Sequence, residues 1–78
     1  MLLPLDKVIE TVRKEKFELD DKIAKLGMFI RGVSFKDLNG DQKLLLGAQE
    51  QAMMHYSTIL RDRLVDLLKQ KAEKVFTK

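Results

Sequence analysis

The chain has 78 residues, no cysteine, one histidine and a net charge of +3, and 35% of its residues are charged. Without cysteine it forms neither disulfides nor thiolate metal sites, and one histidine does not build a zinc site alone. The mild basic excess is far below that of a dedicated nucleic-acid binder. No apolar run approaches the roughly 20 residues that cross a bilayer, so we expect a cytoplasmic protein without signal peptide or membrane contact.

The first predicted helix covers about residues 4–31. Its apolar positions recur at steps of three and four, which predicts one buried face. These positions are Leu5, Val8, Val12, Leu19, Ile23, Leu26 and Ile30. Between Val12 and Leu19, the expected apolar position is occupied by Glu15 or Lys16. Lys22 follows Glu15 by seven residues on the same flank. Gly32 is placed to end the helix in a left-handed cap.

An elbow follows at residues 32–40, the one convincing break in the helical pattern. Ser34 with Asp37 resembles a capping pair, which predicts a single helical turn here. The apolar side chains of Phe35 and Leu38 are expected to close the end of the core.

The second predicted helix covers about residues 41–76, and the cap-like pair Asn39 and Gln42 opens it. Two series with seven-residue spacing run along it, and each forms a line because seven residues make nearly two turns. The apolar line consists of Leu46, Met53, Leu60 and Leu67. The polar line consists of Gln49, Tyr56 and Arg63. We expect the polar line to lie within the half of the helix that faces the core.

The predicted fold is all-α, a single domain that forms an antiparallel helical hairpin with a short helical turn in its elbow. If the elbow lies near residue 36, the numbers of facing residues sum to the low seventies. This register places Lys22 near Gln49 and Glu15 near Tyr56.

Several large apolar residues fall away from the expected contact between the helices. They are Phe17, Met28, Leu44, Met54, Val65, Leu68 and Phe76. Two helices do not enclose a core by themselves, and small domains need further stabilisation. We therefore expect a homo-oligomer, a dimer or tetramer, that assembles as a helical bundle.

The sequence does not indicate catalysis or a cofactor. His55 neighbours Tyr56, but adjacent helical residues point about 100° apart and form no relay. Glu15, Asp20 and Asp21 offer carboxylates without a second cluster that could complete a metal site. We expect a protein that is not an enzyme.

Two explanations of the polar line stay open. In the first, its groups pair internally, for example Arg63 with Glu15 and Tyr56 with a backbone carbonyl, because buried polar groups need partners. In the second, they line a pocket between helices or subunits. Arg63 and Lys22 would then face phosphates, Tyr56 would stack on a base, and Gln49 would bond a base edge.

A coherent set of residues runs through the chain. It comprises Glu18-Leu-Asp-Asp-Lys22-Ile-Ala-Lys-Leu26, Phe29-Ile30, Phe35, Leu38, Leu45-Leu46, Gln49-Glu-Gln-Ala-Met53, Tyr56, Ile59-Leu60 and Arg63-Leu64. In this set, the chain resembles a family of short helical proteins from tailed phages, including the crAss-like group. In size and architecture it also resembles viral sponges, which are oligomers that sequester cyclic-nucleotide immune signals.

The resemblance and the polar line together predict a phage-encoded immune-evasion protein of the host cytoplasm. It would bind and sequester a cyclic-nucleotide second messenger, such as a cyclic dinucleotide, without catalysis. The predicted ligand contacts, inferred from the polar line, are Lys22, Gln49, Tyr56 and Arg63. The alternative is a helical interaction module that inhibits a host defence protein through its outer apolar residues. A third possibility is weak nucleic-acid binding through Arg13, Lys14, Lys16, Lys69, Lys71 and Lys74.

Overall fold

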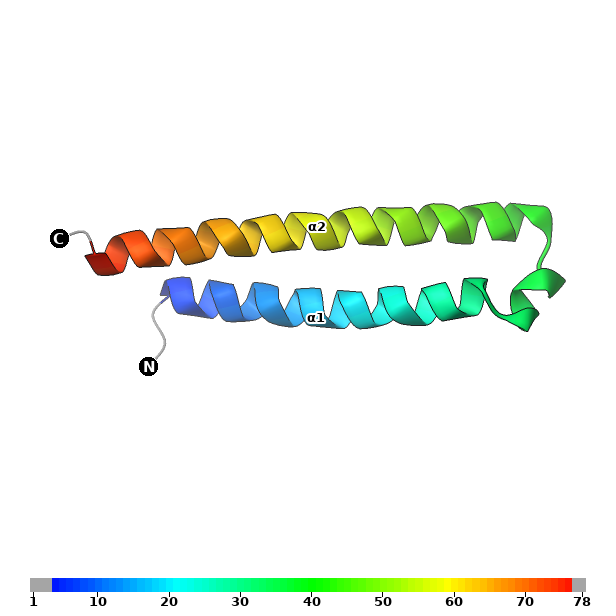
Figure 1. The fold of residues 1–78 in the computed structure, drawn as a ribbon, viewed down its shortest axis with the longest axis horizontal. Helices are drawn as coiled ribbons and strands as arrows, with labels where there is room; N and C mark the ends of the chain where they lie inside the picture. Colours follow the sequence, from blue (N-terminus) through cyan, green and yellow to red (C-terminus); the bar gives the residue numbers. More distant parts are fainter. Residues whose placement is uncertain (1–3, 77–78) are drawn as a thin grey trace.

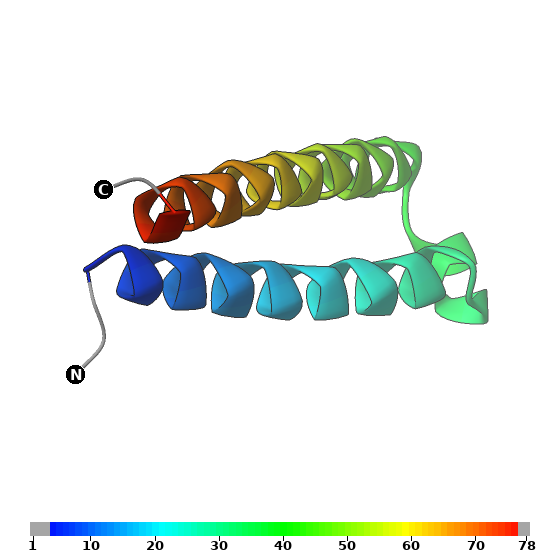
Figure 2. The same cartoon turned by 60° about the vertical axis from the view of Figure 1, so that its left-hand side comes forward.

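A computed structural model describes residues 4–76 of the chain, with side chains through residue 74. It contains helix α1 (Pro4–Ile30), the 3-10 helix η1 (Val33–Asp37) and helix α2 (Gly40–Phe76). The two α-helices run antiparallel and lie side by side in both views (Figures 1 and 2), so the predicted all-α hairpin is confirmed. Within residues 4–76, no helical stretch combines the length and apolarity of a membrane span.

Local signals explain where both helices begin. Pro4 opens α1, where its missing N–H is not needed, and Asp6 lies in the first turn, where the helix dipole favours a negative charge. At the start of α2, the Asn39 Oδ1 atom accepts a 2.8 Å hydrogen bond from the Gln42 backbone N–H. This bond confirms the predicted cap, because it satisfies an N–H that has no partner within the helix.

The end of α1 differs from the prediction. Gly32 has φ −88° and ψ 173°, so the predicted left-handed cap is wrong. The Gly32 N–H instead donates to the Phe29 carbonyl at 3.0 Å, and the chain then leaves in an extended conformation. A Cβ at Gly32 would lie 3.2 Å from the Met28 carbonyl oxygen. Close approach to this carbonyl, rather than a positive φ, therefore favours glycine here.

The elbow closes one end of the hairpin. The predicted helical turn is present as η1, but its N-cap is Gly32 and Ser34 lies inside it, so the predicted Ser34–Asp37 capping pair is wrong. Phe35 and Leu38 are half-buried, and the Phe35 ring meets the Phe29 ring edge-to-face with 6.4 Å between centroids. The Lys43 ammonium lies 5.9 Å from the Phe35 ring centroid. Aromatic packing and a cation–π contact thus hold the elbow against both helices.

The side chains that α1 and α2 bury against each other recur at alternating steps of three and four, the spacing of a coiled coil. We call these residues the seam. They are Ile9, Val12, Lys16, Leu19, Ile23, Leu26 and Ile30 in α1, and Leu46, Glu50, Met53, Ser57, Leu60, Leu64 and Leu67 in α2. The predicted apolar line is therefore confirmed as four of the seven seam residues of α2. Val8, predicted to be buried, is 41% exposed, and Ile9 takes its place at 5%.

The register of the hairpin is fixed by contacts along its whole length. Lys71 Nζ lies 2.7 Å from Asp6 Oδ1 near the open end, and the Ser57 hydroxyl bonds Asp20 in the middle. The residue numbers in each of these pairs sum to 77, whereas those in the predicted pairs sum to 71, so the predicted register is wrong by about six residues, or nearly two helical turns. As a result, Lys22 lies level with Tyr56 instead of Gln49.

Candidate ligand-binding face

The three residues of the polar line are all exposed. The prediction that Gln49, Tyr56 and Arg63 face the core is wrong, because the seam is formed by the adjacent line of Glu50, Ser57 and Leu64. Each of these seam residues follows a residue of the polar line by one position, and one position turns a side chain by about 100° around the helix. The polar line therefore lies on the flank of the seam.

The predicted internal pairing of this line is not observed. Among the described residues, neither Tyr56 nor Arg63 makes a side-chain hydrogen bond or ion pair, and Gln49 contacts only the sulfur of Met53 at 3.9 Å. Because these side chains are exposed, water can satisfy their polar groups, and a buried partner is not required. The polar groups of Tyr56 and Arg63 are therefore accessible to a ligand.

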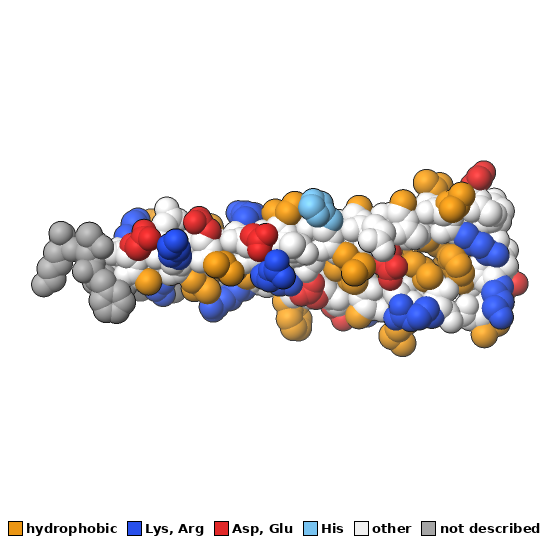
Figure 3. Space-filling model, turned by 45° about the horizontal axis from the view of Figure 1, so that its top comes forward, with side chains coloured by type: hydrophobic (Ala, Val, Ile, Leu, Met, Phe, Trp, Pro, Cys, Tyr) orange, Lys and Arg blue, Asp and Glu red, His pale blue; other side chains and the backbone are white. Residues whose placement is uncertain are grey.

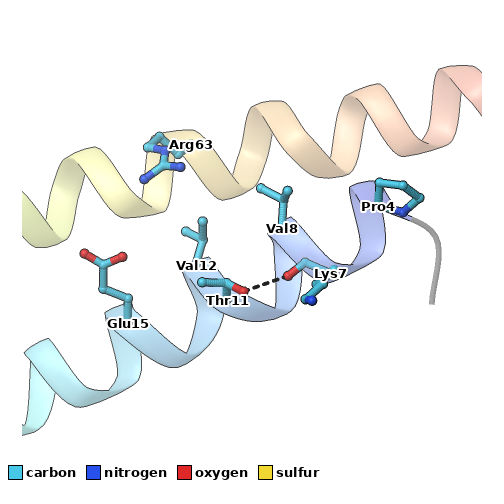
Figure 4. A pocket seen from close by; sticks show the side chains of 7 residues that line it. All are labelled: Pro4, Lys7, Val8, Thr11, Val12, Glu15 and Arg63. Carbon is cyan, nitrogen blue, oxygen red and sulfur yellow. Dashed lines mark hydrogen bonds between the residues drawn. The ribbon is translucent and has the colours of Figure 1, made fainter. Parts of the chain in front are cut away.

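Lys22 shares its face with the polar line. Val8, Glu15, Lys22 and Phe29 have seven-residue spacing and so form a line on one flank of α1. Residues of both lines border a single groove (Figure 4), so the two lines lie on the same face of the hairpin. We call this surface the polar face. It consists of Val8, Glu15, Lys22, Phe29, Gln49, Tyr56 and Arg63.

The groove on the polar face has a volume of about 360 Å³. Its lining residues are Pro4, Lys7, Val8, Thr11, Val12, Glu15 and Arg63. Val12 is 2% exposed and forms an apolar floor, whereas Glu15 and Arg63 project from opposite helices (Figure 4). The Thr11 hydroxyl already donates to the Lys7 carbonyl at 2.9 Å. The groove therefore combines an apolar floor with one carboxylate and one guanidinium.

The four predicted contact residues do not converge on one point. Gln49 and Arg63 are two heptads apart, which is about 21 Å along a helix. Tyr56 lies about 10 Å from each of them, and Lys22 is level with it. One chain thus brings Lys22, Tyr56 and Arg63 into neighbouring heptads. Gln49 of the same chain is too far away to contact a compact ligand that is bound at these three residues.

A polar cluster inside the seam was only half predicted. Lys16 Nζ donates to Asp20 Oδ2 and to Ser57 Oγ, both at 2.9 Å. The Ser57 hydroxyl in turn donates to Asp20 Oδ1 at 2.5 Å. The hydrogen bond from Ser57, and then that from Lys16, lowers the pKa of Asp20 below its ordinary value because both favour the carboxylate.

This cluster joins the two helices in the middle of the hairpin. Ser57 is 9% exposed, and burying its hydroxyl is tolerated because both of its partners are charged. The interrupted apolar series left Glu15 and Lys16 open, and the structure places Lys16 in the seam; Ser57 was missed. The signal was present in its spacing, since Ser57 lies four residues after Met53 and three before Leu60.

The opposite flank of the hairpin also exposes large apolar side chains. We call it the apolar face. It consists of Phe17, Leu44, Met54, Val65 and Leu68, whose exposed fractions range from 42% to 78%. Met28, on the back of α1, is 72% exposed, and the side chain of Phe76 lies outside the described residues. A space-filling view shows apolar side chains gathering toward the elbow end of the surface, among charged ones (Figure 3).

Three of the basic residues lie beside acidic groups. Lys16 belongs to the cluster in the seam, and Lys71 pairs with Asp6. Arg13 borders a second groove, of about 460 Å³, together with Asp6, Glu10 and Lys71. Within the described part of the chain, no group of three or more His, Cys, Asp or Glu side chains could hold a metal ion. These placements direct attention to the polar face.

Comparison with known proteins gives one match. The family model described as Sequestin matches residues 6–66. No curated protein and no solved structure matches the chain. The matched range includes the whole polar face and the polar cluster of the seam, and it excludes the end of α2.

Proposed function

Because the chain belongs to the Sequestin family, we propose that it is a sequestering protein that holds a cyclic nucleotide on its polar face and does not transform it. The family name supports sequestration of a ligand, and the class of ligand is our assignment. One observation carries that assignment: Lys22, Tyr56 and Arg63 are exposed together on one face, and no ion pair engages them within the described residues. A phage that encodes such a protein would withdraw an immune signal from its host.

The chemistry of these three side chains suits a nucleotide. An arginine fork matches the oxygens of a phosphate, and a lysine adds a second positive charge. A tyrosine ring stacks on any base, and one such contact contributes about 1–3 kcal/mol. A cyclic nucleotide presents both a phosphate and a base, so it uses the cations and the ring together.

A single hairpin offers only an open surface, whereas sites for small ligands usually enclose most of the ligand. We therefore propose that a second copy covers the ligand. If the copies lie antiparallel across their polar faces, Gln49 of one chain comes near Arg63 of the other, which brings all four predicted contacts to one ligand. The apolar face supplies a second contact between copies, and the two contacts together give a pair of dimers.

The proposal is tested by thermal shift and calorimetry with a panel of cyclic mononucleotides and dinucleotides. A ligand at a hundredfold excess over its Kd should stabilise the protein by about 2.7 kcal/mol. Heat denaturation of the complex should then release the ligand chemically unchanged. A panel that gives no shift and no heat of binding would contradict the proposal, as would a modified ligand.

Arg63→Ala should abolish binding while the helical fold is retained. Arg61→Ala is the matched control, because Arg61 lies on the opposite flank, where it pairs with the Asp62 carboxylate at 3.2 Å. Equal affinities for the two variants would place the ligand elsewhere.

The exposed apolar face favours one alternative, an inhibitor that docks on a host defence protein. Met54 is 47% exposed at the centre of this face, and Met54→Glu places a charge in any contact there. If another copy covers the face, the variant lowers the mass of the oligomer in sedimentation experiments. If the wild-type chain sediments as a monomer and a host protein co-purifies with it but not with the variant, the alternative is correct.

A further inference from the structure

We infer that the groove between Glu15 and Arg63 binds the ribose and phosphate of the ligand, so the protein selects ribonucleotides that carry a free 2′-hydroxyl. This inference rests on the proposed function and assigns a role to Glu15, which was not among the predicted contacts. The ligand it implies presents an anion and a hydrogen-bond donor side by side.

Glu15 and Arg63 carry opposite charges and face the same groove without forming an ion pair in the described part of the chain. Glu15 is half-buried and Arg63 exposed, and both border the same groove from opposite helices (Figure 4). They carry opposite charges, yet no ion pair or hydrogen bond joins them within the described residues. If they did pair, a contact this exposed would contribute only about 0–1 kcal/mol, so a ligand could separate them at little cost.

The carboxylate restricts which ligands fit. A carboxylate only accepts hydrogen bonds, and it repels a bare phosphate bound at the neighbouring guanidinium. A ligand that offers a phosphate to Arg63 and a hydroxyl to Glu15 satisfies both groups. Ribose has this arrangement, and acidic side chains bond the ribose 2′-hydroxyl in other nucleotide sites.

The walls and size of the groove agree with a sugar. Val8 and Val12 supply the apolar surface against which a ribose ring lies. The volume of about 360 Å³ is near the lower end of the roughly 300–1,000 Å³ range of ligand pockets. The groove therefore accommodates one portion of a nucleotide signal and not the whole molecule. Tyr56 follows one heptad away, about 10 Å along the helix, where it can stack on the base.

The test compares a cyclic dinucleotide with the 2′-deoxy analogue that has the same bases. Wild-type protein should bind the ribonucleotide about tenfold more tightly or better, because a hydrogen bond to a charged group is lost with the hydroxyl. Glu15→Gln keeps the shape of the side chain and removes its charge, and it should bring the ratio of the two Kd values close to one. Glu10→Gln, which removes a carboxylate that borders the groove on the other flank, should leave the ratio unchanged.

The outcomes separate this inference from the proposed function. If wild-type protein binds both analogues equally, or if Glu15→Gln preserves the ratio, nucleotide binding stands and the role of Glu15 is overturned. If neither analogue nor any other nucleotide binds, the proposed function and this inference fail together. The wild-type comparison remains decisive even if the Glu15 variant does not fold.

Discussion

The seam and the polar face are neighbouring lines on the same two helices, and both repeat every seven residues. In the seam, Leu60 is fully buried and the polar Ser57 has two charged partners, Lys16 and Asp20 of α1. On the polar face, Tyr56 and Arg63 have the same spacing but remain exposed and unpaired within the described residues. A seven-residue repeat thus identifies a line of side chains, whereas burial and satisfied hydrogen bonds decide which line stabilises the fold.

The largest expected effect concerns the centre of the seam. Leu60 is 0% exposed, so Leu60→Ala should lower the free energy of unfolding by about 2–5 kcal/mol through lost burial and a cavity. Leu45, at 61% exposed and outside the apolar face, is the control, and Leu45→Ala should cost no more than about 0.5 kcal/mol. Urea denaturation measures both. Similar losses would show that the chain is not stabilised chiefly by its seam.

The polar cluster of the seam should have the next largest effect. Ser57→Ala removes hydrogen bonds to two charged groups, while Lys16 and Asp20 still pair with each other. We expect a loss of about 1.5 kcal/mol. Thr58→Ala serves as the control, because the Thr58 hydroxyl is exposed and donates only to the Met54 carbonyl at 3.2 Å. Equal denaturation midpoints for the two variants would show that the cluster does not contribute to the stability of the fold.

Acid should weaken the same cluster. Hydrogen bonds from Ser57 and Lys16 lower the pKa of Asp20 from its ordinary value of 3.8, so folding favours the ionised carboxylate. This contribution to stability is present above pH 3.8 and is lost as the pH falls through the lowered pKa. Asp20→Asn should therefore flatten the acid side of a stability–pH profile. Asp21→Asn, at an exposed pair with Lys25, is the control, and identical profiles for the two variants would contradict the prediction.

A smaller effect, of opposite sign, is expected at Gly47. A Cβ added there meets no atom within 4 Å, and alanine is favoured over glycine within a helix by up to about 1 kcal/mol. Gly47→Ala should therefore raise the thermal midpoint. A lower midpoint would show that another copy approaches α2 closely at Gly47, which would place an interface on the side of α2 that carries this residue.

The smallest effect on stability should come from the polar face. Tyr56→Ala should change the free energy of unfolding by no more than about 0.5 kcal/mol, since the side chain makes no hydrogen bond among the described residues. The same variant should weaken nucleotide binding by about 1–3 kcal/mol, and Tyr56→Phe should retain the affinity. A strongly destabilised alanine variant would assign Tyr56 to the fold instead of to the ligand.

The features that the sequence predicts well are local. Helix spacing, the elbow turn and the Asn39 cap depend on residues close together in the chain, and the structure confirms them. It was harder to predict which side of α2 faces α1, because the line of residues on either side of the apolar line could have formed the rest of the seam. Gln49 follows Leu46 by three residues and Glu50 by four, and both are polar, so hydrophobicity does not choose between them there.

The register and the groove depend on contacts between distant residues. Ser57 meets Asp20 and Lys16 across the hairpin, and hydrophobic patterning does not detect a polar contact. A shift of nearly two turns moved Glu15 from the level of Tyr56 to that of Arg63. This register brings the carboxylate and the guanidinium to one groove, whereas the sequence suggested only an ion pair between Arg63 and Glu15.

The most direct test of the central claim is an NMR titration of the protein with a cyclic nucleotide that gives a thermal shift. The account predicts that the largest amide and side-chain shift changes cluster at Lys22, Tyr56 and Arg63, while those of Leu60 in the seam change little. Changes that instead centre on the apolar face around Phe17 and Met54 would contradict it.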